Sequence, residues 1–161
     1  DGRWGIHLRP SMGQDEFGGQ DAPDYLCALF AATYTLRASL SLCAGLGMRH
    51  PHAGHWRRIL HEGMAFPRLL DRDTGVYASS RVRGWRLHKQ KHPVQLAPLF
   101  SLPQPVDPAT RKAYLLRHQL CANDRPGMRH PGTGGSFYDG WTLFAYALAC
   151  AKAGDARAAR E

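Results

Sequence analysis

The sequence predicts an all-α protein built from successive helical hairpins. Its longest helical segment, residues 21–45, has apolar residues at steps of three and four. Further helical segments follow, each stopped by glycine or proline, and almost nothing indicates a substantial sheet. With 161 residues, of which 43% are hydrophobic, the chain can form one domain with its own core. Helix pairs of this kind build bundles, helical repeats and toroids, and no repeat motif selects among them.

The first long helix is expected over residues 21–45, after an extended or irregular N-terminal segment. Asp21 is its expected N-cap, Pro23 lies in its first turn, and Asp24 places a negative charge near its N-terminus. Gly45 and Gly47 end the helix, because glycine is the preferred residue just past a helix terminus. The expected apolar face consists of Leu26, Leu29, Phe30, Thr33, Leu36, Leu40 and Cys43.

A second helix is expected over residues 55–66, and Pro67 stops it because proline lacks the backbone N–H that a helix needs. The residues that follow, 68–92, are expected to be mostly non-helical. They contain a turn sequence at residues 73–75 and the start of a short strand at Val76.

Three further helices are expected, over residues 93–102, 107–122 and 137–153. Asp107 and Pro108 form a favourable N-cap and N1 pair for the second of them. Gly154 is the expected C-cap of the third, and Asp155 the expected cap of a helix beyond it. A glycine-rich loop over residues 123–136 separates the last two helices, and a loop of that length is commonly functional.

The charge and the hydropathy argue against two classes of partner. The formal net charge is +8, but the arginines are scattered and no recognition-helix or aromatic–basic motif accompanies them, so nucleic acid is not an expected partner. No apolar run approaches the roughly 18 to 20 residues that a membrane span needs, so no membrane partner is expected. The chain starts with Asp rather than Met, which indicates a piece of a longer protein or a processed one.

The cysteines and histidines predict neither disulfides nor a metal site. The four cysteines, Cys27, Cys43, Cys121 and Cys150, show no CxxC spacing and are expected to be free thiols in a reducing, cytoplasmic compartment. The tightest histidine cluster is His50, His52 and His55. Its spacing is not that of ligands on one helix face, so a polar loop is favoured over zinc.

The glycine-rich loop ahead of the long helix carries two adjacent carboxylates, Asp15 and Glu16, between Gly13 and Gly18. Most such pairs are simply solvated loop charges, but this kind of loop can also hold a side chain at the mouth of a cavity. A carboxyl group beside a second negative charge can stay protonated near neutral pH and act as a proton donor, and Glu16 next to Asp15 is the candidate.

Further motifs follow this loop in order along the chain. They are Tyr25 near the start of the long helix, Trp56 early in the next one, the pair Lys89-Gln90, an apolar segment ending in Leu102-Pro103, and a small-residue helix closing with Gly154-Asp155. In this order the motifs resemble the catalytic domain of glycoside hydrolase family 65, whose general acid lies in a GPDE-like loop. The resemblance implies an (α/α)6 toroid of six helical hairpins, of which residues 1–161 would be a partial barrel, the C-terminal half of the catalytic domain.

The resemblance also implies roles for individual residues. Glu16 would be the general acid, with Asp15 bracing the loop or contacting the substrate. Lys89 and Gln90 would contact sugar hydroxyls, and a surface role for Lys89 stays open. His92 would join them in binding the substrate or a phosphate.

Asp139 is the candidate second carboxylate. It occupies the place where phosphorolytic members of the family carry a Ser-Ser pair, and a carboxylate there suits activation of water better than binding of a phosphate dianion. A simple capping role for Asp139 stays open as well.

We therefore expect an enzyme that cleaves an α-glycosidic bond of a disaccharide or oligosaccharide by hydrolysis with inversion. Phosphorolysis of an α-glucoside disaccharide is the first alternative, with inorganic phosphate as co-substrate; no other cofactor is expected. A non-catalytic carbohydrate-binding or interaction protein on a helical toroid is the second. A homodimer of the intact parent is compatible with these readings.

Overall fold

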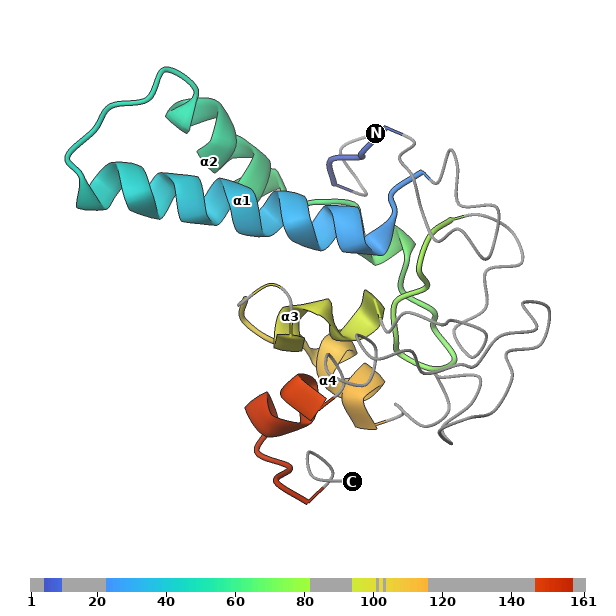
Figure 1. Cartoon of the computed structure of the whole chain (residues 1–161). Coiled ribbons are helices and arrows are strands. Elements are labelled where there is room, and N and C mark those ends of the chain that lie inside the picture. Colours follow the sequence, from blue (N-terminus) through green and yellow to red (C-terminus); the bar gives the residue numbers. More distant parts are fainter. Residues whose placement is uncertain are drawn as a thin grey trace, which may run out of the picture.

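The computed structural model describes residues 5–9, 23–81, 94–100, 102, 104–115 and 147–157. Its elements in chain order are α1 (Leu26–Gly45), α2 (Ala53–Glu62), the 3-10 helix η3 (Phe66–Arg68), the 3-10 helix η5 (Val94–Leu96), α3 (Ala97–Phe100) and α4 (Pro108–Leu115). Residues 147–152 are also helical. Over the described residues only isolated bridges stand in for strands, so the predicted all-α class is confirmed there. Figure 1 shows α1 and α2 as a hairpin that extends away from the shorter helices.

Helix α1 begins later than the sequence predicted. Its N-cap is Tyr25, with no side-chain capping bond, rather than Asp21, which lies outside the described residues. Pro23 therefore precedes the first turn instead of lying in it. The reason is Asp24, which has φ of 50°, a left-handed conformation that a right-handed helix cannot include. The first turn of a helix has backbone N–H groups without a partner in the helix. One of them, that of Leu26, donates to the carbonyl of Ser79 at 2.7 Å.

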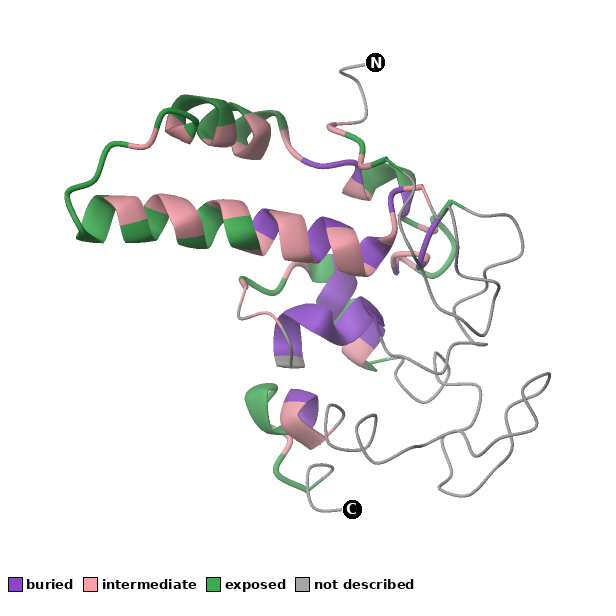
Figure 2. Cartoon of the chain, turned by 45° about the horizontal axis from the view of Figure 1, so that its top comes forward, coloured by how far each residue is buried: buried purple, intermediate pink, exposed green. Residues whose placement is uncertain are grey.

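Only the first half of the predicted apolar face of α1 is buried. Leu26, Leu29, Phe30 and Thr33 are buried, whereas Leu36, Leu40 and Cys43 are partly exposed. Figure 2 shows this change along the helix, from buried residues at its start to exposed ones toward the connection with α2. The end of α1 at Gly45 agrees with the prediction.

The expectation that no segment is apolar enough to cross a membrane was wrong. Helix α1 has 20 residues and a mean hydropathy of 1.4, which meets the requirement by length and composition. The polar Ser and Thr residues within it lower that hydropathy less than the sequence reading assumed. A core helix of a soluble protein or a signal sequence meets the same requirement, so this property alone does not put α1 in a membrane.

Helix α2 ends before its predicted stop. Gly63, with φ of 81°, terminates it, and Pro67 lies in η3 instead. Met64, expected inside the helix, forms a parallel bridge with Ile6. The backbone N–H of Ile6 donates to Gly63 at 2.7 Å, and that of Ala65 donates to Ile6 at 2.9 Å. The extended character predicted around Ile6 is thus confirmed, and it fixes residues 5–9 against the end of α2.

The turn predicted at residues 73–75 is confirmed. Oδ1 of Asp71 accepts hydrogen bonds from the backbone N–H groups of Asp73 and Thr74 and from the Thr74 hydroxyl, and these bonds hold the pKa of Asp71 below its ordinary value. Across the turn, Leu70 and Tyr77 form an antiparallel bridge. The short strand expected from Val76 is thus reduced to this isolated bridge among the described residues.

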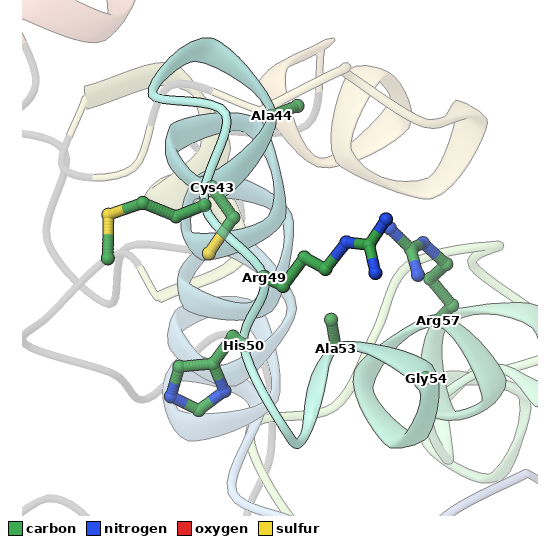
Figure 3. A pocket seen from close by; sticks show the side chains of 8 residues that line it. Cys43, Ala44, Arg49, His50, Ala53, Gly54 and Arg57 are labelled. Carbon is green, nitrogen blue, oxygen red and sulfur yellow. The ribbon is translucent and has the colours of Figure 1, made fainter.

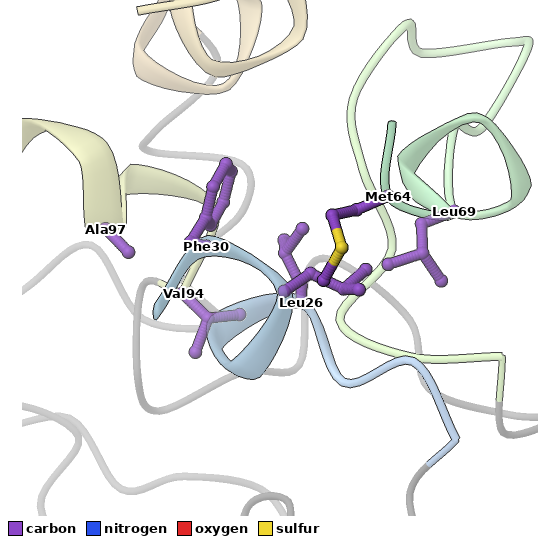
Figure 4. Packing of buried hydrophobic residues seen from close by; sticks show 7 residues of the cluster. Leu26, Phe30, Met64, Leu69, Val94 and Ala97 are labelled. Carbon is purple, nitrogen blue, oxygen red and sulfur yellow. The ribbon is translucent and has the colours of Figure 1, made fainter. Parts of the chain in front are cut away.

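Two apolar clusters form the described core. The first is shown in Figure 4 and consists of Leu26, Leu29, Phe30, Met64, Leu69, Val94 and Ala97. The second consists of Val76, Leu96, Leu99, Ala113 and Ala149. Because η5 and α3 contribute residues to both, the predicted helix over residues 93–102 exists as these two short elements and joins the clusters.

Helix α4 has the predicted cap. Oδ1 of Asp107 accepts from the backbone N–H of Thr110 at 2.7 Å, and Pro108 is the first helical residue. Gly154, with φ of 79°, ends the last helical segment as predicted. Asp155 does not cap a further helix among the described residues; its Oδ2 accepts from the Tyr114 hydroxyl at 2.8 Å. The predicted helical residues 116–122 and 137–146, and the loop 123–136, lie outside the described residues.

Candidate functional site

All the site residues expected from the sequence lie outside the described residues. These are Asp15, Glu16, Lys89, Gln90, His92 and Asp139. The structure does describe the residues that flank them in the chain. The candidate site is therefore built from the groups that hold those flanking residues in place.

A buried carboxylate, that of Asp24, lies at the start of α1. Its side chain is 0% exposed, receives two hydrogen bonds and forms an ion pair. Oδ1 accepts from the backbone N–H of Leu8 at 2.8 Å, Oδ2 accepts from His7 Nδ1 at 2.7 Å, and Nε of Arg81 lies 3.0 Å from Oδ2. A buried carboxylate is costly unless it is paired and hydrogen-bonded, and here all three partners are supplied by segments distant in sequence.

The hydrogen bonds fix the tautomer of His7. An ionised Asp24 can only accept, so Nδ1 of His7 carries the proton that it donates. Nε2 faces Nη1 of Arg68 at 3.4 Å, and a guanidinium can only donate, so Nε2 accepts. His7 is thus the neutral Nδ1–H form with Asp24 as its orienting partner. Because its side chain is 31% exposed and Nε2 faces Arg68, this pair is better suited to holding the backbone than to proton transfer.

The described residues on both sides of the segment that carries Asp15 and Glu16 are held near the start of α1. On the N-terminal side, the bond from Leu8 to Asp24 fixes the chain just before residue 10. On the C-terminal side, the carbonyl of Pro23 accepts from the Ser80 hydroxyl at 2.9 Å. The described residues that flank residues 10–22 in the chain, Leu8 and Asp24, therefore lie next to each other, just before the start of α1.

The segment that carries Lys89, Gln90 and His92 starts and ends beside the same turn. Arg81, its last described residue on one side, is bonded to Asp24. Val94, the first on the other side, packs in the same apolar cluster as Leu26. Both segments that hold predicted site residues are thus anchored at one point of the fold, although their members are far apart in the sequence.

The flanks of the segment that carries Asp139 lie in the other cluster. Ala113 in α4 precedes this segment, Ala149 follows it, and both pack with Val76 and Leu96. Since Val76 and Leu96 come from the same two stretches as Arg81 and Val94, the two anchoring regions adjoin. The structure brings the flanks together and does not describe Asp139 itself.

Sequence reasoning missed the role of Asp24. It was expected to act on the helix dipole from the first turn, but the helix starts after it and its carboxylate binds Arg81 and His7. A signal was present in the residue type, because aspartate is among the few residues that tolerate a positive φ. The partners carried no signal, since only the fold brings residues 7, 24 and 81 together.

A buried hydroxyl beside this network has no hydrogen-bond partner among the described residues. Oγ of Ser79, a fully buried residue, makes no hydrogen bond in the described part of the chain, whereas its backbone carbonyl accepts from Leu26. The neighbouring Ser80 hydroxyl is bonded to Pro23. The interior next to Asp24 is therefore polar, and one of its groups is unsatisfied.

Two cavities lie away from this network. One, of about 430 Å³, is bounded by Leu70, Tyr77, Ala109 and Lys112, between the residue 70–77 turn and α4. The other, of about 390 Å³, lies between the end of α1 and the start of α2. Within the described ranges no group of three His, Cys, Asp or Glu side chains is placed to hold a metal ion.

The described cysteines are free. Cys27 and Cys43 are partly buried and Cys150 is fully buried. Burial raises the pKa of the Cys27 thiol above its ordinary value, which makes it a weak nucleophile. Free thiols were expected at these three positions, and Cys121 lies outside the described residues.

Comparison of the chain with protein-family models, curated proteins and solved structures finds no match.

Proposed function

We propose that this chain is part of an enzyme that cleaves an α-glycosidic bond by hydrolysis with inversion, on a toroid of helical hairpins. The observation that carries the proposal is the common anchor at Asp24. It joins the flanks of the segment containing Glu16 to the flank of the segment containing Lys89 and Gln90. A general acid and the groups that orient its sugar must lie within one small site, and a shared anchor favours such an arrangement.

The hairpin of α1 and α2 supports the fold part of the proposal. A toroid of this class consists of antiparallel helix pairs, and α1 and α2 are such a pair joined by a short connection (Figure 1). The apolar start of α1 faces η5 and α3, which belong to the next part of the chain. Successive pairs would then pack side by side through faces of this kind.

The chemistry assigns one task to each carboxylate. Glu16 protonates the leaving oxygen while water attacks the anomeric carbon from the opposite face, activated by Asp139. Inversion requires the two carboxyl groups to stand roughly 6.5 to 9.5 Å apart, so that a water fits between them and the sugar. Lys89 and Gln90 donate to the sugar hydroxyls, and His92 lies beside them in the sequence.

The test is cleavage of a panel of α-linked disaccharides by the full-length protein, with and without inorganic phosphate, while the product and its anomeric configuration are recorded. We expect an inverted free sugar without phosphate. Glu16→Gln should lower kcat by about 10²- to 10⁴-fold with little change in sugar binding, and Asp15→Asn should do much less. A sugar 1-phosphate formed only when phosphate is present would establish phosphorolysis instead. Binding of the sugars without any cleavage would contradict both enzymatic readings.

A further inference from the structure

The free end of the α1–α2 hairpin, residues 42–58, exposes large apolar side chains. Leu42 and Leu46 are each 62% exposed, and Met48 is 59% exposed. These residues lie at the end of α1 and in its connection to α2, and Figure 2 shows this part of the hairpin furthest from the shorter helices. Single exposed apolar residues are ordinary on protein surfaces, but a group of them at the end of a projecting element indicates a binding surface.

The same hairpin carries positive charge and no negative charge until its end. Between Tyr25 and His61 the sequence has no aspartate or glutamate, and its arginines are Arg37, Arg49, Arg57 and Arg58. Arg58 is paired with Glu62 at 3.7 Å. No ion pair of Arg49 or Arg57 is found among the described residues, so both charges are available to a ligand.

These two arginines share a cavity. It has a volume of about 390 Å³, and Arg49, Arg57 and His50 line it together with small or apolar residues such as Cys43 and Ala44. Figure 3 shows the guanidinium groups of Arg49 and Arg57 pointing toward each other across it. Two like charges directed at one space repel each other until an anion lies between them, and a guanidinium pair matches the oxygens of a phosphate.

The connection that bears Arg49 is held in place. The ring of His50 stacks on that of Trp56, with centroids 4.3 Å apart and planes at 22°. The backbone N–H of His52 also donates to Nδ1 of His50 at 3.2 Å. These contacts join the connection to α2, the helix that bears Arg57. The backbone positions of Arg49 and Arg57 are therefore fixed relative to each other.

We propose that the hairpin end binds the surface of a bilayer rich in anionic phospholipid. The headgroup phosphate lies between Arg49 and Arg57, and Leu42, Leu46 and Met48 enter the boundary between headgroups and acyl chains. The apolar residues beside the cavity favour a lipid phosphate over a free one, because a soluble anion would not need them. This proposal replaces the expectation of no membrane partner and does not depend on the proposed glycosidase activity.

The binding is peripheral, not transmembrane. Leu26 and Leu29, at the other end of α1, are 0% exposed and pack in the core with residues such as Leu69. A helix whose first half belongs to that core cannot cross a bilayer without unfolding it. Only the second half, which is already exposed, is free to touch the membrane.

The experiment is co-flotation of the full chain with vesicles. Vesicles of phosphatidylcholine mixed with phosphatidylserine should capture the protein, and vesicles of pure phosphatidylcholine should not. The double variant Arg49→Gln/Arg57→Gln should lower the partition coefficient roughly thirtyfold, since each basic residue near an anionic surface contributes about a fivefold factor. Arg37→Gln/Arg58→Gln removes the same charge away from the cavity and is the matched control. Leu42→Ser/Leu46→Ser should weaken binding even at high salt, where attraction between charges is screened.

Each alternative outcome overturns the proposal in a distinct way. Failure to float with anionic vesicles, or equal losses in the two arginine double variants, contradicts it. Calorimetric binding of glycerol phosphate that needs Arg49 and Arg57, without vesicle binding, would assign the cavity to a soluble anion. Capture of duplex DNA without vesicle binding would assign the charge to nucleic acid. All the substituted side chains are exposed, so circular dichroism melting should show unchanged folding in every variant.

Discussion

Nε of Arg81 lies 3.0 Å from Oδ2 of Asp24, and this ion pair attaches the end of the residue 69–81 stretch to the start of α1. The carboxylate is fully buried and the guanidinium is partly exposed. The strength of the pair depends on charge, because an amide in place of the carboxylate would turn N–H donors toward the donors of Arg81 and His7.

Asp24→Asn should therefore lower the free energy of unfolding by about 3 kcal/mol, as expected when a buried ion pair loses one partner. Asparagine tolerates the left-handed backbone at this position as aspartate does. The decrease in the free energy of unfolding would therefore come from the lost charge and not from backbone strain. Urea denaturation of the two proteins measures it. If the proposed glycosidase is correct, turnover should fall as well while Glu16 is unchanged, since Asp24 acts as a positioning residue. A loss below about 1 kcal/mol would show that the network is dispensable.

Tyr77→Phe should reduce stability in a pH-dependent manner. The Tyr77 hydroxyl donates to Oδ2 of Asp107 at 3.0 Å, and burial, together with the negative charge of Asp107 and this bond, raises the pKa of Tyr77 well above its ordinary value of 10.0. The unfolded chain ionises first as the pH rises, so the contribution is complete below pH 10 and lost above it. We expect Tyr77→Phe to cost about 1 to 2 kcal/mol at neutral pH.

Above pH 10 the difference between wild type and Tyr77→Phe should shrink. Denaturation at a series of pH values between neutral and strongly alkaline checks this. Tyr34→Phe is the control, because no hydrogen bond of the Tyr34 hydroxyl is found among the described residues. A Tyr77→Phe penalty that does not change with pH would contradict the assignment.

Gly5→Ala should be strongly destabilising for two independent reasons. Gly5 has φ of 84°, which disfavours any side chain, and a Cβ there would lie 2.7 Å from the carbonyl oxygen of Met64. We expect a loss of about 2 to 4 kcal/mol, measured by thermal unfolding. Gly45→Ala, whose Cβ would meet nothing within 4 Å, should change stability by less than about 1 kcal/mol. Equal effects at the two positions would mean that residues 5–9 do not hold the end of α2.

Ser79→Ala and Ser80→Ala should change the free energy of unfolding by different amounts, and in opposite directions if Ser79→Ala is stabilising. Removing the Ser79 hydroxyl eliminates a buried group that has no partner in the described part of the chain, and it should be neutral or stabilising. Removing the Ser80 hydroxyl breaks its bond to the carbonyl of Pro23 and should cost about 1 kcal/mol. Parallel urea titrations of both variants compare them. If Ser79→Ala were the costlier change, a partner of that hydroxyl, such as an interior water, would be indicated.

The contrast between Asp107 and Asp24 explains what could be predicted from the sequence. Oδ1 of Asp107 caps the helix that follows it, through Thr110, so local capping rules found this role, whereas the bond from Tyr77 to Oδ2 carried no local signal. Asp24 acts on residues 7 and 81, and local rules assigned it to the nearest helix instead. Helix ends also divide into those set by neighbouring residues and those set by distant ones. The ends at Gly45 and Gly154 were predicted because glycine stops a helix locally. The start of α1 was not, because there the backbone N–H of Leu26 donates to the distant carbonyl of Ser79.

The exposed half of α1 could not be predicted for a related reason. Periodicity showed that Leu26 and Leu40 share a face, but it cannot show how far along the helix a partner extends. In the fold the shorter helices cover Leu26 and leave Leu40 partly exposed. The candidate site residues were proposed from the sequence alone. The described structure adds only how the residues that flank them in the chain are held together.

Contacts between residues far apart in the sequence have a consequence for the rate of folding. They join Ile6 to Met64, Asp24 to Arg81 and Phe30 to Gln104. Helical proteins usually fold fast because their contacts are local. Here the start of α1 gains its partners only after a long stretch of later chain has been made, so during synthesis this helix emerges before the residues that stabilise it. Its apolar side chains are then open to other proteins for a time set by translation, and folding should depend more on chaperones than is usual for an all-α chain of this size.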